Sequence, residues 1–255
     1  MCIRDSAYLT DAYLTDAYLA GAYLTEANLA GAYLTDAYLA GANLAGANLT
    51  DAYLAGANLA GANLAGANLT DAYLAGAYLT GANLARANLA RANLTGANLT
   101  DAYLTDANLA GADLARANLA GANLARAKLA DAYLTDANLA GANLARANLT
   151  GANLTGAYLT GAYLTGANLT DAKFENTKWR DGVVITRAPL EISGLPYMVY
   201  ILDDYMQIGC ELHKLTDWAN FDNARIARMD GVKARKFWDA YGGALIALAA
   251  ADGRK

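Results

Sequence analysis

The apolar positions of the chain recur with a period of five over two-thirds of its length. Alanine stands at every fifth position from Ala7 to Ala172. Leucine follows two residues later from Leu9 to Leu169, and Phe174 continues that series. An α-helix turns about 100° per residue, so a step of five would spread the leucines around every face of a helix. A continuous strand fails as well, because an odd period sends successive leucines to opposite faces. The pattern therefore excludes both a long helix and a long strand.

One arrangement buries both the alanines and the leucines. A three-residue extended segment, Ala-x-Leu, points Ala and Leu inward and x outward, and a two-residue corner then turns the chain. From residue 11 to residue 171 the fifth position of the unit is Gly, Asp or Arg, with Glu26 as the one exception. Because Gly and Asp suit turns, the corner composition agrees with this arrangement.

Units such as Ala42–Gly46 and Ala117–Gly121, which both read Ala-Asn-Leu-Ala-Gly, resemble those of the pentapeptide-repeat family. The resemblance implies a mainly β fold, a right-handed, four-sided β-helix with four pentapeptides per coil. The 34 units would form about 8.5 coils, and a strand spacing of about 4.8 Å gives a rod roughly 41 Å long. The chain departs from the family in often having Tyr rather than Asn or Asp before Leu, which alters the outer surface.

With 20 residues per coil, residues 20 apart should stack in columns. One column contains the four tyrosines Tyr13, Tyr33, Tyr53 and Tyr73, and another contains a run of asparagines. Tyrosine is favoured at protein interfaces, so the tyrosines are the predicted contact surface. The alternative is that their rings stack on one another and stabilise the sheet. Arg91 should lie over Asp71, and Arg126 over Asp106, as ion pairs in the corners.

Composition and charge narrow the function classes. The chain has 255 residues, a formal net charge of −5 and 56% hydrophobic residues, and its array contains no Cys, His, Ser or Trp. A convex rod offers no recess for acid–base catalysis, so we expect no enzyme and no cofactor. An acidic balance disfavours direct nucleic-acid binding, and the lack of a long apolar run disfavours a membrane span. The expected location is the cytoplasm.

Residues 1–6, Met-Cys-Ile-Arg-Asp-Ser, fit neither the repeat nor a signal peptide. They resemble the translation of a transposon end attached to DNA during sequencing-library preparation, and the alternative is a short natural arm. We therefore interpret residues 1–6 as an artefact, residues 7–181 as the β-helix and residues 182–255 as a separate domain. On this interpretation Cys2 is not a native cysteine.

After residue 181 the pattern changes to that of a small α+β domain. Short strands are predicted at Val183–Thr186, Leu190–Ser193, Tyr197–Leu202 and Met206–Cys210. Helices are predicted at Leu215–Met229, with Thr216 as N-cap, and at Val232–Ala250, separated by Asp230-Gly231. This domain resembles tails attached to other bacterial and phage pentapeptide-repeat proteins. Its expected task is to cap the open end of the solenoid.

Cys210 and His213 form the one chemically suggestive pair, Cys-x-x-His. It is half of a zinc site, or a catalytic thiol–imidazole couple if the two side chains touch. The alternative is a small buried Cys that ends a strand and a His that caps the following turn. Cys210 and His213 are thus weak candidates for metal ligands, and we predict no metal site.

The leading prediction is a non-enzymatic interaction protein whose rod presents tyrosine and asparagine columns to a protein partner. A metal- or thiol-dependent activity through Cys210 and His213 is the alternative from another class. The resemblance adds DNA gyrase as a candidate partner, since some family members bind it as DNA-shaped decoys. A homodimer also stays open. Ice binding is disfavoured, because Thr is scattered over all four columns.

Overall fold

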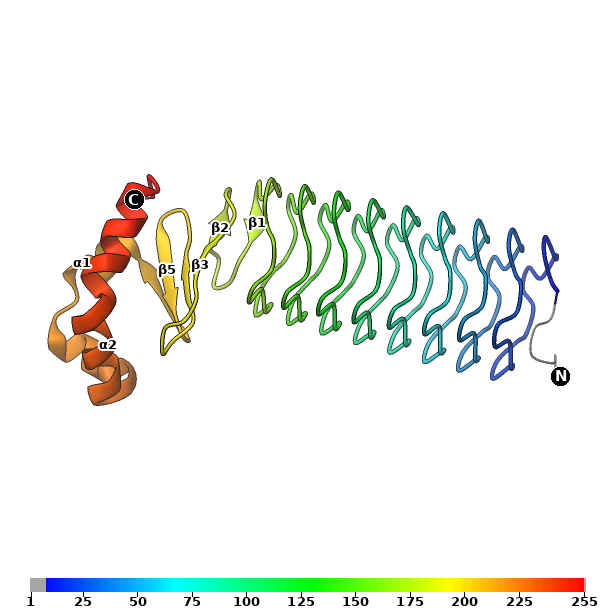
Figure 1. Ribbon diagram of the computed structural model, residues 1–255, viewed down its shortest axis with the longest axis horizontal. Helices are drawn as coiled ribbons and strands as arrows, with labels where there is room; N and C mark the ends of the chain where they lie inside the picture. The colour runs from blue at the N-terminus through cyan, green and yellow to red at the C-terminus, as the bar shows by residue number, and fades with distance from the viewer. Residues whose placement is uncertain (1–7, 255) are drawn as a thin grey trace. The chain divides into compact units, whose positions relative to one another are not determined.

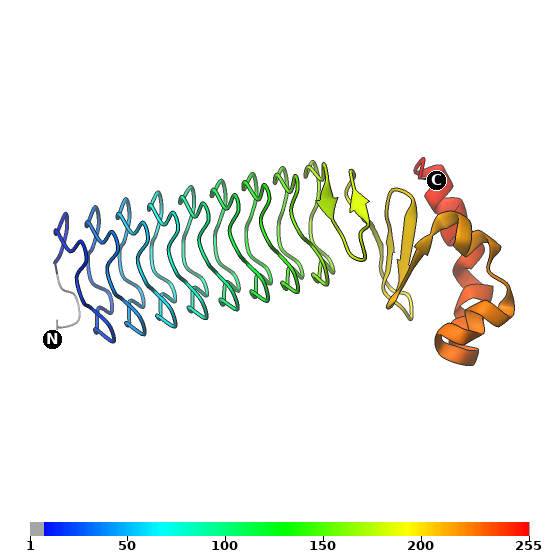
Figure 2. The ribbon, with the colours of Figure 1, turned by 180° about the vertical axis from the view of Figure 1, so that it is seen from behind.

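The repeat folds as a solenoid whose coils are held together by main-chain hydrogen bonds. The computed structural model describes residues 8–254 and divides the chain into two units, Met1–Val184 and Ile185–Lys255. Residues 1–6, including Cys2, lie outside the described residues, so the artefact interpretation stays a prediction. Figures 1 and 2 show the coils of the first unit stacked along one axis.

Each outward residue makes a parallel bridge to the residue 20 positions further along the chain, from Tyr8 with Asn28 to Tyr158 with Lys178. A typical link has the Leu14 amide donating to the Tyr33 carbonyl at 2.7 Å and the Tyr33 amide donating to the Ala12 carbonyl at 2.9 Å. The predicted spacing of 20 residues per coil is therefore confirmed. Three residues, Ala-x-Leu, stand between successive two-residue turns, and the middle one is bridged, so the predicted division of each unit is confirmed.

The inside of the solenoid consists of the alanines and leucines of the repeat. From Leu24 to Leu159, every Ala and every Leu of the series is at most 2% exposed. Burying one leucine side chain contributes about 1.5–3 kcal/mol, so each coil with its four leucines has a substantial apolar core. The predicted inward orientation of Ala and Leu is confirmed.

The corners explain the restricted composition of the fifth position. Every described fifth residue from Asp11 to Asp181 has a positive φ, between 52° and 71°. Such left-handed backbone is readily adopted by Gly and, among other residues, best tolerated by Asp and Asn. The Arg and Glu corners adopt it too, which shows that stacking of the coils overrides the local preference of these residues.

The array ends in an imperfect unit in which Thr177 and Trp179 replace Ala and Leu. Thr177 is fully buried, and its hydroxyl donates to the Leu154 carbonyl at 2.7 Å. Strand β1 (Thr177–Lys178) pairs with β2 (Val184–Ile185), and the Trp179 amide donates to the Val183 carbonyl at 2.9 Å. A buried threonine is thus accommodated at an alanine position because its hydroxyl finds a main-chain acceptor.

The second unit contains a four-stranded antiparallel sheet followed by two helices (Figure 1). Its elements, in chain order, are β3 (Leu190–Ile192), β4 (Val199–Ile201), β5 (Tyr205–Ile208), β6 (Glu211–Lys214), α1 (Leu215–Asn220) and α2 (Asn223–Ala251). Neighbouring strands in the sheet follow the chain order β3-β4-β5-β6. Strand β6 was not predicted, because its polar residues masked its period of two.

The core of this unit lies between the sheet and the helices. Val199, Met206, Trp218, Ile226 and Phe237 are buried in one cluster. The indole nitrogen of Trp218 donates to the Met206 carbonyl at 2.7 Å, which satisfies the only polar atom of that side chain. This bond connects α1 to β5.

The first predicted helix is wrong in its boundaries. α1 ends at Asn220, and Asp222 caps α2 by accepting from the Arg225 amide at 2.7 Å. Thr216 lies inside α1 rather than at its N-cap, and Lys214 occupies the cap without a side-chain hydrogen bond. The predicted break is present as a kink in α2, where Asp230 and Gly231 leave helical geometry.

Within residues 8–254, no helix combines the length and apolar character needed to cross a bilayer.

Candidate functional site

The four tyrosines Tyr13, Tyr33, Tyr53 and Tyr73, here called the Tyr column, stack face to face on one side of the solenoid. Successive ring centroids are 4.8, 4.8 and 4.9 Å apart, and the ring planes are within 4° of parallel. The rings therefore stack along the direction in which the coils repeat, and Tyr13, Tyr53 and Tyr73 are exposed to solvent. The alternative of ring stacking is therefore confirmed, and the role of these tyrosines as a contact surface stays a prediction.

Acidic corners border the Tyr column on both sides. Of the four corners that precede these tyrosines, three carry an acid, namely Asp11, Asp51 and Asp71. Of the four corners that follow them, two do, namely Asp16 and Asp36. Asp11 and Asp51 line a shallow surface hollow together with Tyr33 and Tyr53. From residue 8 to residue 80 the chain has six acids and no Lys or Arg. This surface therefore combines aromatic area with negative charge.

Glycines within these corners give the carboxylates room. A Cβ atom on Gly31 would overlap the Oδ1 atom of Asp11, and one on Gly56 would overlap the Oδ1 atom of Asp36. Each aspartate side chain therefore lies over the corner of the next coil, where only glycine leaves the space free. In the first of these corners Gly31 also separates Asp11 from Asp51 by two coil spacings, about 10 Å, which weakens their mutual repulsion.

The asparagine side chains at the outward position form hydrogen bonds within the solenoid. Asn93 Oδ1 accepts from the Thr95 amide at 3.0 Å, and this bond recurs at other asparagines of the outward position and at Asp113. Neighbouring coils are linked as well, since the Asn108 side-chain amide donates to Asn88 Oδ1 at 2.9 Å. Tyrosine has no acceptor that reaches its own i+2 amide. The family preference for Asn or Asp therefore has a main-chain cause that the sequence analysis missed.

Two corner ion pairs lie where the sequence predicts them. Arg91 donates from Nε to Asp71 Oδ1 at 2.9 Å and from Nη2 to Asp71 Oδ2 at 2.6 Å. Arg126 holds Asp106 in the same two-bond geometry at 2.7 and 2.8 Å. The hydrogen bond from Arg91 lowers the pKa of Asp71, and the one from Arg126 lowers the pKa of Asp106. Both pairs are solvent-exposed, so they contribute little to stability.

Cys210 and His213 are placed differently from both of the structural roles predicted for them. Cys210 is exposed in the turn between β5 and β6, rather than buried at the end of a strand. His213 lies in β6 and does not cap the turn; its Nε2 atom is 2.7 Å from Glu211 Oε2 and 3.3 Å from Arg225 Nη2. Among the described residues, no three His, Cys, Asp or Glu side chains are grouped as metal ligands. A metal or thiol role for the pair stays a prediction.

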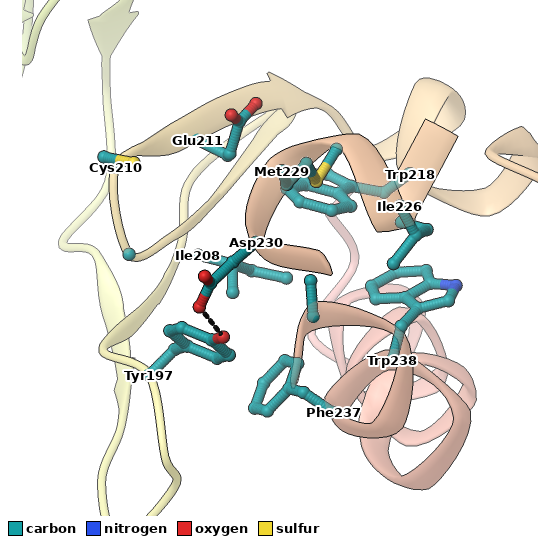
Figure 3. Close-up of a pocket in the computed structure, with 12 residues that line it drawn as sticks. Tyr197, Ile208, Cys210, Glu211, Trp218, Ile226, Met229, Asp230, Phe237 and Trp238 are labelled. Atoms are coloured by element: carbon teal, nitrogen blue, oxygen red, sulfur yellow. Dashed lines mark hydrogen bonds between the residues drawn. The ribbon is translucent and has the colours of Figure 1, made fainter. Parts of the chain in front are cut away.

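A cavity of about 260 Å³ lies in the second unit, between the β5–β6 turn and the kinked helix α2 (Figure 3). Its walls include Trp218, Phe237 and Trp238, and Tyr197 stands beside Asp230 on the other side. The Tyr197 hydroxyl donates to Asp230 Oδ2 at 2.5 Å, and this bond, with burial and the nearby charge, raises the pKa of Tyr197. This cavity was not predicted, because its lining comes from four separate segments of the chain, which no local pattern connects.

The repeat matches a family model described as pentapeptide repeats. The model matches eight copies over residues 7–44, 32–71, 67–106, 102–141 and 142–178. No curated protein sequence is significantly similar to the chain.

Several solved structures are similar to the chain. HetL from the cyanobacterium Nostoc sp. strain PCC 7120, a pentapeptide repeat protein involved in heterocyst differentiation regulation, is 38% identical; the match covers 71% of this chain and 88% of HetL at a TM-score of 0.28. Rfr23 from the cyanobacterium Cyanothece 51142 is 42% identical over 38% of this chain and 64% of its own, with a TM-score of 0.34.

QnrB1, a plasmid-mediated fluoroquinolone resistance protein, is 16% identical over 72% of this chain and 91% of its own, with a TM-score of 0.31. All three TM-scores are below 0.5, so the assignment rests on the repeats themselves. The matched segments cover well over half of the chain and coincide with the bridged coils of the solenoid. The chain belongs to the pentapeptide repeat family.

Proposed function

We propose that the protein is a non-enzymatic interaction scaffold whose Tyr column, with its acidic corners, contacts a basic surface on a protein partner. The observation that carries this proposal is the stack of four parallel tyrosine rings bordered by Asp11, Asp16, Asp36 and Asp51. Tyrosine supplies large contact area at interfaces, and complementary charge raises the association rate.

The stacked arrangement favours binding because the rings are ordered before a partner arrives. A side chain that is immobilised only on binding costs about 0.5–1.5 kcal/mol in lost rotamer freedom. Tyr33 and Tyr53, each stacked on two neighbours, have already lost most of that freedom in the free protein. The asparagines are less suited to contact a partner, since their polar atoms bond to the solenoid itself.

The test separates the Tyr column from the rest of the solenoid. In the variant Tyr33→Asn/Tyr53→Asn, each new asparagine has an acceptor for its own i+2 amide, so the fold should persist while the aromatic surface is lost. The matched control is Tyr103→Asn/Tyr163→Asn, which makes the same change on another column. Affinity purification followed by mass spectrometry should recover a basic partner with the control but not with the first variant.

Salt dependence and a further double variant test whether the negative charge of the acidic corners contributes to binding of the partner. Recovery should fall as ionic strength rises, and Asp11→Asn/Asp51→Asn should weaken it at low salt. A partner retained by all these variants would contradict the proposal. DNA gyrase is tested alongside as a candidate partner: inhibition of supercoiling by the native chain that disappears in Tyr33→Asn/Tyr53→Asn would assign it.

A further inference from the structure

We propose that the cavity of the second unit binds a small organic cation, an ammonium group attached to an aromatic or aliphatic body. The inference is independent of the Tyr column, because the cavity lies within the second unit and its lining comes from that unit alone. It rests on the shape of the cavity, on the chemistry of its walls and on the sign of its charged groups.

The walls of the cavity are apolar and aromatic. Ile226, Phe237 and Trp238 form the side provided by α2, and Ile208 lies opposite on β5 (Figure 3). The Trp218 and Trp238 rings are stacked with centroids 5.1 Å apart, so this wall is presented as a rigid surface. An apolar cavity of about 150 Å³ already holds benzene. A volume of about 260 Å³ therefore accommodates a phenyl ring with a short chain.

The charged groups at the cavity have one sign. The lining includes the carboxylates of Asp230 and Glu211, and none of its twelve residues is basic. Glu211 is engaged elsewhere, since its Oε2 atom is 2.7 Å from His213 Nε2 and 3.7 Å from Arg225 Nη2. Asp230 is therefore the carboxylate available to a ligand. An ammonium group placed beside it gains a charge-assisted hydrogen bond next to an apolar wall.

The backbone holds Asp230 at this place. Asp230 and Gly231 interrupt α2 with non-helical torsion angles, and Gly231 has a φ of 59°. The kink turns the Asp230 side chain toward Tyr197, whose hydroxyl donates to Oδ2 (Figure 3). This contact uses one carboxylate oxygen and leaves Oδ1 for a ligand. The kink, the tyrosine and the aromatic wall together make a site that recognises positive charge and apolar surface at once.

Three phenyl compounds of similar size test the charge selectivity on the full-length chain. 2-Phenylethylamine is a cation at neutral pH, 3-phenylpropan-1-ol is neutral and 3-phenylpropionate is an anion. Because Trp218 and Trp238 line the cavity, tryptophan emission reports occupancy, and calorimetry gives the affinity. We expect the amine to bind at least about tenfold more tightly than the alcohol, and the carboxylate to bind most weakly.

Two aspartate variants then place the cation. Asp230→Asn should weaken binding of the amine by about tenfold and leave binding of the alcohol unchanged. Asp239→Asn is the matched control, because Asp239 is an exposed aspartate of α2 outside the cavity lining, and it should change neither. Ala234→Leu fills the cavity and should remove binding of all three compounds; circular dichroism confirms that the variant is folded.

The outcomes are decisive in each case. Equal affinity for the three compounds, or amine binding that is unaffected by Asp230→Asn, would show a cavity without selectivity for positive charge and overturn the proposal. Absence of amine binding to the full-length chain at millimolar concentration would overturn it as well. Selective amine binding that is weakened by Asp230→Asn, removed by Ala234→Leu and unchanged in Asp239→Asn supports it, independently of the result for the Tyr column.

Discussion

The Tyr33 ring lies parallel to the Tyr53 ring one coil further on, with centroids 4.8 Å apart and planes 1° from parallel. The separation equals the spacing between bridged strands, so the rings stack because the backbone puts them there. A tyrosine at the outward position lacks the hydrogen bond that an asparagine makes to its own i+2 amide, but its ring stacks on the tyrosines of the neighbouring coils. Tyrosine at this position exchanges a main-chain hydrogen bond for ring stacking and an exposed aromatic edge.

Tyr53→Ala and Tyr53→Asn measure this exchange. Tyr53→Ala removes the stacking on Tyr33 and Tyr73, which is worth about 0.5–1.5 kcal/mol per pair, and we expect it to lower the free energy of unfolding by about 1–3 kcal/mol. Tyr53→Asn should recover about 0.5–1.5 kcal/mol of this loss, because its side chain can accept from the Ala55 amide. Guanidinium chloride unfolding followed by circular dichroism gives both values. Equal destabilisation by the two variants would count against the compensation.

The Asp71–Arg91 pair has a defined pH dependence. The hydrogen bond from Arg91 lowers the pKa of Asp71 in the folded state, so the contribution of the pair is complete above the unfolded pKa of about 3.9. It disappears as the pH falls through the lower, folded value. Arg91→Gln should return the pKa of Asp71 toward its ordinary value, measured by carbon NMR of the carboxyl group. Arg116→Gln changes an arginine of another corner column and should leave it unchanged.

The corner backbone predicts which residues can replace a glycine. Gly61 has a φ of 63°, and a Cβ atom there would meet nothing within 4 Å, so backbone strain alone decides the effect. Gly61→Asn should lower the free energy of unfolding by less than about 1 kcal/mol. Gly61→Val should lower it by about 2 kcal/mol or more, because β-branched residues are outliers in this region. Thermal unfolding of the two variants checks the difference, and similar values would argue against corner strain.

The placement of His213 predicts that it does not increase the reactivity of the Cys210 thiol. Since His213 Nε2 contacts Glu211 and Arg225, we expect His213→Ala to leave the rate of Cys210 alkylation within about twofold of the native chain. Iodoacetamide labelling across pH 6–9, quantified by mass spectrometry, measures this rate. A large drop in His213→Ala, or stoichiometric zinc in the purified protein, would restore the metal or thiol hypothesis.

The repeat could be predicted from sequence because its signal is local and repeated. Every unit buries the same two side chains, so the period of five defines the unit, and the four units per coil that the family resemblance implies define the columns. The stacking of Tyr33 on Tyr53 and the pairing of Arg91 with Asp71 follow from the resulting spacing of 20. The bond from asparagine to its own i+2 amide was missed for a different reason. It depends on the exact direction of a side chain beside a turn, which a pattern of apolar positions does not contain.

The second unit was less predictable because its contacts are not periodic. The helix boundary at Asn220 depends on Asp222 capping α2, and β6 carries too little apolar character to stand out. The contact of Tyr197 with Asp230 joins residues 33 positions apart. That this unit closes the end of the solenoid, and that the domains divide at residue 181, stay predictions.

The spacing of 20 residues has a consequence for how such chains can change in length. Gain or loss of a whole coil leaves every remaining residue in its own column, so each side and each corner of the solenoid keeps its residues in the same order. Gain or loss of one pentapeptide keeps the core intact, yet it moves every later unit onto the next side of the solenoid. We therefore expect the fold to tolerate insertions of five residues. The arrangement of side chains on its outer surface should be retained only when 20 residues are inserted.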